Sequence, residues 1–371
     1  MATVVPRVSP DQAEEIALRH YGVTGRAERL NAEHDDTFRI VPTAGPSRLL
    51  KIGVTSEKTE GVSFQTAILL HLAATAPRLP VQRVTRTLTG ASEARITGHG
   101  PARLARMTSW LDGELLARAP VDAGLRRDLG ATLARLSIAL RGFRHPGAQR
   151  THLWDLQNFW RLRPLLDELP ASGLLPETAR AFPEGLPSGL PAGGLRAALA
   201  DCLDRFDTVV RPLLAATPVQ VVHTDFHGEN LLTDGARITG VLDFGDALTG
   251  PVAMDVGVAA CYQLGSGQPG SGQFGSRLAG SGQPDLLAPA LDVIAGYHAV
   301  DPLGHRDLTL AAELIVARVA ARIIVSQRNA LREPANCGYL LRRTPQAIQL
   351  LAALRQVAPG EVARRLLREV K

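Results

Sequence analysis

Two short stretches near the middle of the chain carry polar side chains that could transfer a phosphoryl group. The first, VHTDFHGEN, places Asp225 and Asn230 directly after a run of apolar residues. The second, ITGVLDFGD, places Asp243 at the end of another apolar run. Asp234 and Gly235, which lie between the two stretches, are a strong signal for a tight hairpin turn. We therefore expect a hairpin that returns Asp243 to the loop of Asp225 and Asn230 and gathers the three side chains.

Transfer of a phosphoryl group from a nucleoside triphosphate to a hydroxyl needs such a set of groups. A carboxylate must orient the attacking hydroxyl and accept its proton, a role that we assign to Asp225. Mg²⁺ is a hard cation that prefers oxygen ligands, and Asn230 and Asp243 offer an amide oxygen and a carboxylate. Polar residues beside a hairpin are often only turn formers, but three at these spacings between apolar strands favour catalysis. We therefore expect Mg²⁺ as the cofactor and ATP or GTP as the phosphoryl donor.

These stretches resemble the aminoglycoside phosphotransferase and choline kinase-like family, which has a protein-kinase-like fold. The resemblance rests on His223-Thr224-Asp225 with Asn230, on Leu242-Asp243-Phe244-Gly245, and on Asp255. It implies that His223 supports the catalytic loop by hydrogen bonds and that Asp255 is a structural carboxylate. Thr224 stands where the family usually has Gly, a departure that leaves these roles intact.

Three weaker features narrow the resemblance to the hydroxylysine kinase branch of that family. They are residues 33–38, residues 152–156, and the motifs within residues 328–340. The resemblance covers nearly the whole chain apart from a Pro-rich connection at 170–194 and a Gly/Ser-rich segment at 265–284. It implies a kinase that acts on a hydroxylated amino acid or amino alcohol.

The first hundred residues favour a small sheet with helices against it. Ser9, Pro10 and Gln12 form a helix start with a capping box, and Gly22 predicts the end of that helix. The remaining elements expected here are strands at 37–41 and 48–52, a helix at 61–74, and strands near 81–88 and 102–109.

From residue 110 onward helical patterns predominate. The helices are expected at 125–140, 153–169, 196–214, 286–298, 308–329 and 344–354, with one β-rich interval at 219–244. The expected fold class is therefore α+β: a bilobal protein-kinase-like fold with a small β-rich N-lobe and a larger, mainly helical C-lobe. The N-terminal nucleotide-binding lobe would span residues 1–109, and the C-terminal catalytic and substrate-binding lobe 110–371. Residues 265–284 would form a solvated surface insertion.

The apolar segment 49–52 contains a single cation, Lys51, which in a kinase-like fold would bind the phosphates of the nucleotide. The helix that follows should offer Lys51 an acidic partner, but the position aligned by the resemblance holds an amide, Gln65. Glu57 and Glu60 are the alternative partners. A hydrogen bond from Lys51 to an amide would be weaker than a charged pair.

Further nucleotide contacts are expected around the small sheet. No glycine-rich phosphate loop is present, so residues 31–37 take its place, and His34 and Thr37 would help to cover the phosphates. Thr108, Ser109 and Trp110 form the predicted hinge between the lobes, where backbone groups would hydrogen-bond the base. The Trp110 side chain is expected to pack between the lobes rather than to stack on the base.

Substrate-binding residues are expected in the larger lobe, in two chemical sets. An amine group would require carboxylates: Glu229 and Asp246 flank the catalytic loop, and Asp155 is a further candidate. A carboxylate group would require arginine: Arg318 and Arg322 lie one helical turn apart and share a face, which suits bidentate binding. Each of these residues could equally be a solvated charge at the edge of its element.

The overall composition limits the other classes of function. The net charge of +5 is spread along the chain and only 4% of residues are aromatic, which argues against nucleic-acid binding. Three cysteines without paired spacing argue against a disulfide framework and a zinc site. No apolar run reaches the ~20 residues that span a bilayer, and no signal segment is seen. We expect a cytoplasmic protein that binds a small hydroxyl-bearing molecule and neither nucleic acid nor a membrane, and its oligomeric state stays open.

Three functions agree with these features to different degrees. The leading hypothesis is a kinase of a hydroxylated amino acid or amino alcohol. The second is an antibiotic phosphotransferase that acts on an aminoglycoside or nucleoside antibiotic in resistance or biosynthesis. The third is a pseudokinase that binds nucleotide without transfer, and the intact set of Asp225, Asn230 and Asp243 argues against it.

Overall fold

The N-terminal part of the protein is built on an antiparallel sheet. The computed structural model describes residues 7–30, 35–53, 59–97, 102–264, 285–357 and 360–369. Within them the strands follow the order β1-β2-β3-β6-β4, and β5 also pairs with β6. The strands are β1 (Gly25–Leu30), β2 (Asp36–Pro42), β3 (Arg48–Gly53), β4 (Val84–Thr85), β5 (Ala94–Ile96) and β6 (Arg103–Ser109).

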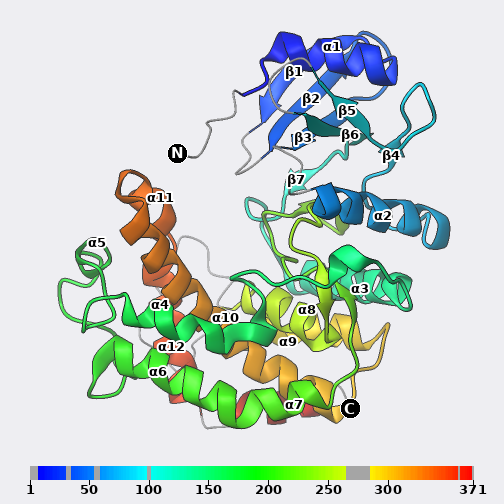
Figure 1. The fold of residues 1–371 in the computed structure, drawn as a ribbon. Helices are drawn as coiled ribbons and strands as arrows, with labels where there is room; N and C mark the ends of the chain where they lie inside the picture. The colour runs from blue at the N-terminus through cyan, green and yellow to red at the C-terminus, as the bar shows by residue number, and fades with distance from the viewer. Residues whose placement is uncertain are drawn as a thin grey trace.

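Two helices accompany this sheet on different sides. Helix α1 (Pro10–Tyr21) packs on the side where Phe38, Leu50 and Met107 form a small apolar core. Helix α2 (Thr59–Thr75) lies between the sheet and the helices of the C-terminal part (Figure 1). Because side chains alternate along a strand, burial of Leu50 against α1 turns Lys51 to the opposite, α2-facing side. The alternation of β3 therefore places Lys51 in the space between the two parts of the molecule.

Local sequence signals in the N-terminal part are largely confirmed. The Ser9 side chain accepts a hydrogen bond from the Gln12 backbone, the Gln12 side chain accepts one from Ser9, and Gly22 ends the helix with a φ of 67°. The hairpin expected at 37–41 and 48–52 is formed by β2 and β3, and the helix expected at 61–74 is α2. The strand expected at 81–88 is wrong for most of its length, because β4 covers Val84–Thr85 alone and Val81 pairs instead with Val241, far along the chain. Strands β1 and β5 were not expected.

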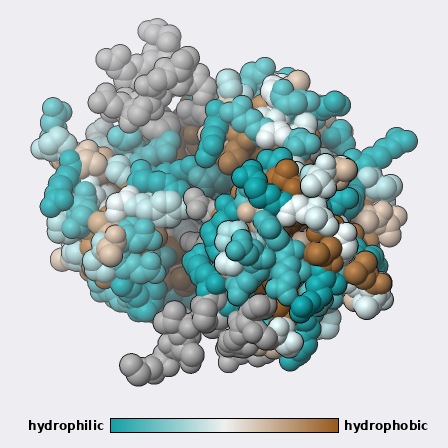
Figure 2. Space-filling view, turned by 90° about the horizontal axis from the view of Figure 1, so that it is seen from above, coloured by the Kyte–Doolittle hydropathy of each residue, from teal (hydrophilic) through white to brown (hydrophobic). Residues whose placement is uncertain are grey.

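The C-terminal part is a helical assembly around one large core. Helix α3 (Ala123–Leu140) packs on α9 (Ala288–His298), and α8 (Val252–Cys261) packs on the long helix α10 (His305–Arg332). Around them lie α4 (Arg163–Asp167), α5 (Pro176–Ala179), α6 (Gly194–Arg205), α7 (Arg211–Ala215), α11 (Cys337–Leu341), α12 (Thr344–Gln356) and α13 (Glu361–Glu369). Apolar side chains gather in this core, and the face seen from above is mainly hydrophilic with scattered hydrophobic patches (Figure 2).

Two of the expected helices of this part are interrupted. The region 153–169 begins as a 3-10 helix, η3 (Leu156–Leu162), and becomes α-helical only in α4. The region 196–214 contains a π-helical segment at Phe206–Val210 between α6 and α7. Pro212 explains the second interruption, because it has no N–H to donate to the carbonyl four residues earlier.

A short β hairpin, residues 231–241, lies in the C-terminal part and pairs with Val81 of the N-terminal part. It is called the catalytic hairpin below. Strand β9 (Leu231–Thr233) pairs with β10 (Ile238–Val241) across the Asp234–Gly235 turn, and β7 (Glu114–Leu115) extends this sheet. Strand β8 (Gln220–Val222) pairs with β11 (Leu248–Gly250). The α+β, bilobal kinase-like fold expected from the sequence is confirmed, whereas the lobe boundary at residues 109 and 110 stays a prediction.

None of the helices in the described ranges is both long and apolar enough to cross a membrane.

The close approach of α3 and α9 yields a stability prediction. A Cβ at Gly130 would lie 1.9 Å from the Val293 carbonyl oxygen, so Gly130→Ala must push the helices apart. We expect the free energy of unfolding, measured by urea denaturation, to fall by about 1–3 kcal/mol. Gly338→Ala in α11 is the matched control, since no atom lies within 4 Å of its Cβ position. Equal stability of Gly130→Ala and wild type would contradict the tight packing described here.

Candidate active site

The loop that follows β8, residues 223–230, is called the catalytic loop here and contains Asp225 and Asn230. It is hydrogen-bonded to Leu242, the residue before Asp243. The Leu242 backbone N–H donates to the Asn230 carbonyl oxygen over 2.9 Å, which brings the two ends of the hairpin together. Thr224 and Asp243 are the non-glycine residues with left-handed backbone in the described ranges, with φ of 67° and 54°. A left-handed φ at position 224 is the physical reason why glycine suits this position.

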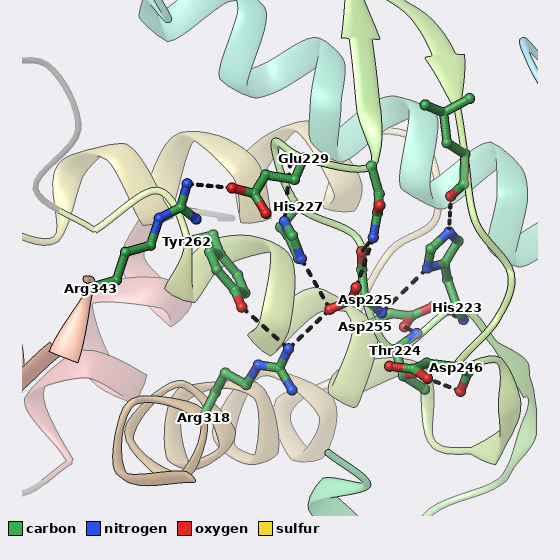
Figure 3. Close-up of polar contacts among 12 residues, drawn as sticks. His223, Thr224, Asp225, His227, Glu229, Asp246, Asp255, Tyr262, Arg318 and Arg343 are labelled. Atoms are coloured by element: carbon green, nitrogen blue, oxygen red, sulfur yellow. Dashed lines mark hydrogen bonds and ion pairs between the residues drawn. The ribbon is translucent and has the colours of Figure 1, made fainter. Parts of the chain in front are cut away.

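A buried carboxylate holds the beginning of the loop. Asp255, on α8, accepts hydrogen bonds from the backbone N–H groups of His223 (2.8 Å) and Thr224 (2.5 Å). The His223 ring bonds the Leu242 carbonyl oxygen at 2.9 Å, and the Thr224 hydroxyl donates to the Asp246 carbonyl oxygen at 2.8 Å (Figure 3). These contacts link the catalytic loop to the segment that carries Asp243. Burial raises the pKa of Asp255 above its usual value, against the effect of His223.

Asp225 lies at the centre of a set of charged and polar side chains. Its Oδ2 accepts a hydrogen bond from Asn230 Nδ2 at 2.7 Å. Its Oδ1 lies 3.0 Å from Arg318 Nη2 and 3.1 Å from His227 Nε2 (Figure 3). Burial by itself would raise the pKa of Asp225, but the His227 hydrogen bond and the Arg318 charge outweigh it and hold this pKa well below its usual range. The carboxylate therefore stays ionised throughout the neutral range.

The Arg318 side chain comes from α10 and is held by aromatic rings. It is only 2% exposed, and its guanidinium lies 4.8 Å from the ring centroid of Trp154 and 5.6 Å from that of Tyr262. Arg318 also donates to the Tyr262 hydroxyl at 3.3 Å. Aromatic faces attract cations, so the two rings help to keep this guanidinium buried beside Asp225.

The residues predicted to bind Mg²⁺ are consistent with such a site. Asn230 uses its Nδ2 to bond both the backbone and the side chain of Asp225, which leaves its amide oxygen for another partner. The side chain of Asp243 is about half exposed, and its Oδ1 accepts from the Gly245 N–H. No group of three or more His, Cys, Asp or Glu side chains gathers for a metal in the described ranges. The amide oxygen of Asn230 and the carboxylate of Asp243 would supply a mixed oxygen set of the kind that Mg²⁺ accepts.

Lys51 connects the small sheet to this site. Its Nζ lies 3.7 Å from Asp243 Oδ2, and this charge holds the pKa of Asp243 below its usual value. Gln65, expected beside Lys51, instead accepts a hydrogen bond from Arg106 at 3.0 Å. Of the alternative partners, Glu57 lies outside the described residues, as does the side chain of Glu60.

Of the other residues predicted to bind nucleotide, Thr37 lies on β2, Thr108 and Ser109 lie on β6, and Trp110 follows β6 directly. Thr37 is paired with Lys51 across β2 and β3 and is buried. Thr108 and Ser109 end β6, and the Trp110 ring lies under Arg39, with 4.5 Å from guanidinium to ring centroid. The Trp110 ring is thus covered by a side chain of β2. His34 lies outside the described residues.

The residues predicted to bind substrate differ in how far other groups of the protein already occupy them. Glu229 forms ion pairs with Arg343 (2.5 Å) and Arg342 (3.6 Å) from the region between α11 and α12. Asp155 is buried and caps η3 by accepting hydrogen bonds from residues 157 and 158, so its carboxylate is already occupied. Arg322 lies 4.8 Å from the Tyr262 ring centroid, one turn beyond Arg318.

Asp246 and several residues that the sequence did not single out complete the surroundings. The backbone carbonyl of Asp246 bonds Thr224 and His152. Arg150 donates to the carbonyl oxygens of Gly245 and Ala247 and so holds the segment after Asp243 in place. Tyr262, Arg343 and Arg106 were also missed, because each reaches the site from an element distant in sequence. A weak signal existed for Arg106, one of two arginines within the otherwise uncharged sequence of β6.

Comparisons with known proteins place the chain in a family and identify its fold. Residues 26–282 match the phosphotransferase enzyme family (APH). Hydroxylysine kinase of Danio rerio is 24% identical, over 97% of this chain and 95% of that protein. The solved structure of a microcompartment-associated aminopropanol kinase has a TM-score of 0.61 at 16% identity, over 94% of this chain and 98% of that one. Amicoumacin kinase with AMP-PNP and Ca²⁺ has a TM-score of 0.62 at 14% identity, over 90% and 92%.

The family match spans most of the chain, including β2, β3 and the whole catalytic hairpin. It confirms the family resemblance expected from the sequence, and the solved structures confirm the kinase-like fold. The chain therefore belongs to the APH phosphotransferase enzyme family and is a small-molecule kinase that transfers a phosphoryl group to an alcohol group.

Proposed function

We propose that the protein transfers the γ-phosphoryl group of ATP or GTP, with Mg²⁺, to a hydroxyl of a hydroxylated amino acid or amino alcohol. The observation that carries this proposal is the setting of Asp225. Its carboxylate is bonded to Asn230, held by Arg318, and linked through the hairpin to Asp243 and Lys51. An ionised carboxylate so fixed can orient a hydroxyl toward the phosphorus atom.

Asp225 acts in this proposal mainly by positioning. A carboxylate with a depressed pKa is a weak base, so it accepts a hydrogen bond from the acceptor hydroxyl and fixes the line of attack. The new bond forms between the acceptor oxygen and the γ-phosphorus as the bond to the nucleoside diphosphate breaks. The hydroxyl proton passes to Asp225 late in this step and then to solvent. Arg318 and His227 hold the carboxylate in one orientation, which lowers the cost of reaching the reactive geometry.

Asn230, Asp243 and Lys51 are the residues proposed to act on the nucleotide phosphates. Asn230 and Asp243 would hold Mg²⁺, which when bound neutralises phosphate charge. Lys51 would bind the phosphates directly, since its pairing with Asp243 places it at the same site. Residues 1–109 then serve as the nucleotide-binding lobe and residues 110–371 as the catalytic and substrate-binding lobe, with His34, Thr37 and 108–110 on the nucleotide side.

The acceptor is proposed to carry an amine and, where it is an amino acid, a carboxylate as well. Asp246 follows Asp243 by three residues, and Glu229 lies on the catalytic loop, where an amine would compete with Arg342 and Arg343 for its carboxylate. Arg322 lies next to the catalytic Asp225–Arg318 pair without a carboxylate partner among the described contacts. Hydroxylysine kinases among the relatives support this combination. Asp155 and Arg318 are less available, because each is already bound to other groups of the protein.

The direct test is turnover with a panel of acceptors. Purified protein with Mg²⁺ and either ATP or GTP should phosphorylate hydroxylysine or a related amino alcohol, with the product detected by mass spectrometry. Homoserine, choline and a set of antibiotics complete the panel. Turnover of antibiotics alone would reject the proposed acceptor class in favour of an antibiotic phosphotransferase. Asp225→Asn should lower kcat about 10³-fold while nucleotide binding persists. Asp234→Asn at the exposed hairpin turn is the matched control and should keep full activity.

Lys51→Ala tests the nucleotide side of the proposal. Loss of a charged hydrogen bond to phosphate should raise the KM for the nucleotide about tenfold and lower kcat as well. Steady-state kinetics with varied nucleotide measure both quantities. Arg48→Ala, three residues earlier in β3, is the control, because Arg48 bonds the carbonyls of Pro46 and Ser47. Unchanged nucleotide kinetics in Lys51→Ala would rule out the assigned role of Lys51.

Arg318→Met tests how Asp225 is held in place. Asp225 stays ionised at neutral pH even without this guanidinium, so the loss should act through the orientation of the carboxylate. We expect kcat to fall about tenfold while the KM for the nucleotide is unchanged. Steady-state kinetics at neutral pH measure both quantities. Arg332→Met, at the exposed end of the same helix, is the control and should keep the wild-type kcat. Equal kcat values for Arg318→Met and wild type would disprove the role of Arg318.

A further inference from the structure

A second cation lies beside Lys51 on the same face of the sheet. Arg106 of β6 is the direct partner of Lys51 of β3 in the antiparallel register. Directly opposed residues of antiparallel strands project to the same side, so both cations face α2 and the catalytic hairpin. The Arg106 residue is only 6% exposed. A guanidinium in this position is costly unless its hydrogen bonds are met.

Two nitrogens of Arg106 donate hydrogen bonds to α2, whereas its buried Nε has no partner among the described residues. Its Nη2 donates to Gln65 Oε1 at 3.0 Å, and its Nη1 donates to Thr66 Oγ1 at 3.2 Å. Thr66 in turn donates to Glu93 at 2.5 Å, and Ser63 reaches the same carboxylate at 3.4 Å. Arg106 and Glu93, both from the sheet side, thus contact residues 63, 65 and 66 of α2.

The charges around Arg106 relate this contact to the active site. Burial lowers the pKa of Arg106, and the negative charges of Glu93 and Asp243 oppose that change. Arginine remains charged under such conditions. The Arg106 charge is therefore felt at Asp243, the same carboxylate that forms the ion pair with Lys51.

In protein kinases, an ion pair between the strand lysine and an acid of the following helix must be in place for activity. Here the helix residue at the aligned position, Gln65, contacts Arg106. Helix α2 also contacts the C-terminal part, where the His71 ring bonds the Ala139 carbonyl oxygen at 2.8 Å. The position of α2 therefore affects how the sheet with Lys51 meets the catalytic hairpin.

We propose that Arg106 is a positioning residue of the nucleotide site. Through Gln65 and Thr66 it fixes α2 against the sheet, and Lys51 is directed to Asp243 and the nucleotide phosphates. This inference rests on the proposed function of Lys51 and Asp243. Arg106 itself contacts neither the acceptor nor the reacting atoms.

The test compares nucleotide binding in arginine variants of β6. Arg106→Met should weaken binding of Mg·ADP about tenfold, measured by calorimetry without any acceptor, and should lower kcat. Arg106→Lys keeps the charge and should recover most of this affinity. Arg103→Met is the matched control: Arg103 lies on the same strand, is equally buried and pairs with Asp36 at 2.9 Å, but it projects to the α1 side. It should lower the unfolding temperature and leave the Kd of Mg·ADP unchanged.

Each outcome decides for or against the proposal. If Arg106→Met and Arg103→Met change the Kd equally, or if Arg106→Met binds Mg·ADP like wild type, Arg106 has only a structural role. Should Arg106→Met fail to fold, Gln65→Leu removes the same contact from the helix side and is expected to weaken binding in the same direction. Failure of the wild type to bind Mg·ADP would overturn the proposed function and this inference together, whereas wild-type binding without the Arg106 effect overturns the inference alone.

Discussion

The hydrogen bonds between the Asp255 carboxylate and the backbone of His223 and Thr224 are the interaction on which the site depends. They hold Thr224 in a left-handed conformation that a β-branched residue rarely adopts, and so they fix the direction in which the chain leaves β8. The following residues then place Asp225 over α10 and Asn230 against Asp225. Without this buried carboxylate, no hydrogen bond would offset the backbone strain at Thr224.

Two ion pairs divide the negative charge of the site. Asp225 is balanced by Arg318 from the helical part, and Asp243 is balanced by Lys51 from the sheet. Because Lys51 comes from the sheet and Asp243 follows the hairpin of the C-terminal part, the contact that lowers the Asp243 pKa also brings those parts together. The proposed mechanism uses this division, with Asp225 directed to the acceptor and Asp243 to the nucleotide side.

The sequence predicted the local features of the site better than its distant contacts. Asp225, Asn230 and Asp243 flank one hairpin, so turn chemistry and strand pattern were sufficient to bring them together, and β2 with β3 followed from alternation. The contact of Arg318 with Asp225 spans 93 residues, and that of Arg106 with Gln65 spans 41. Such contacts depend on tertiary packing, which no local pattern encodes, and for this reason the partner of Gln65 and the occupied state of Asp155 could not be foreseen.

We propose that Asp243 binds the metal and nucleotide whereas Asp225 binds the acceptor hydroxyl. Mn²⁺ in place of Mg²⁺ allows a direct measurement, because its binding in the presence of ADP can be followed by electron paramagnetic resonance. Asp225→Asn should bind Mn²⁺ with ADP as wild type does but turn over very slowly, whereas Asp243→Asn should lose this Mn²⁺ binding. Undiminished Mn²⁺ binding in Asp243→Asn, or its loss in Asp225→Asn alone, would show that the two carboxylates do not have these separate roles.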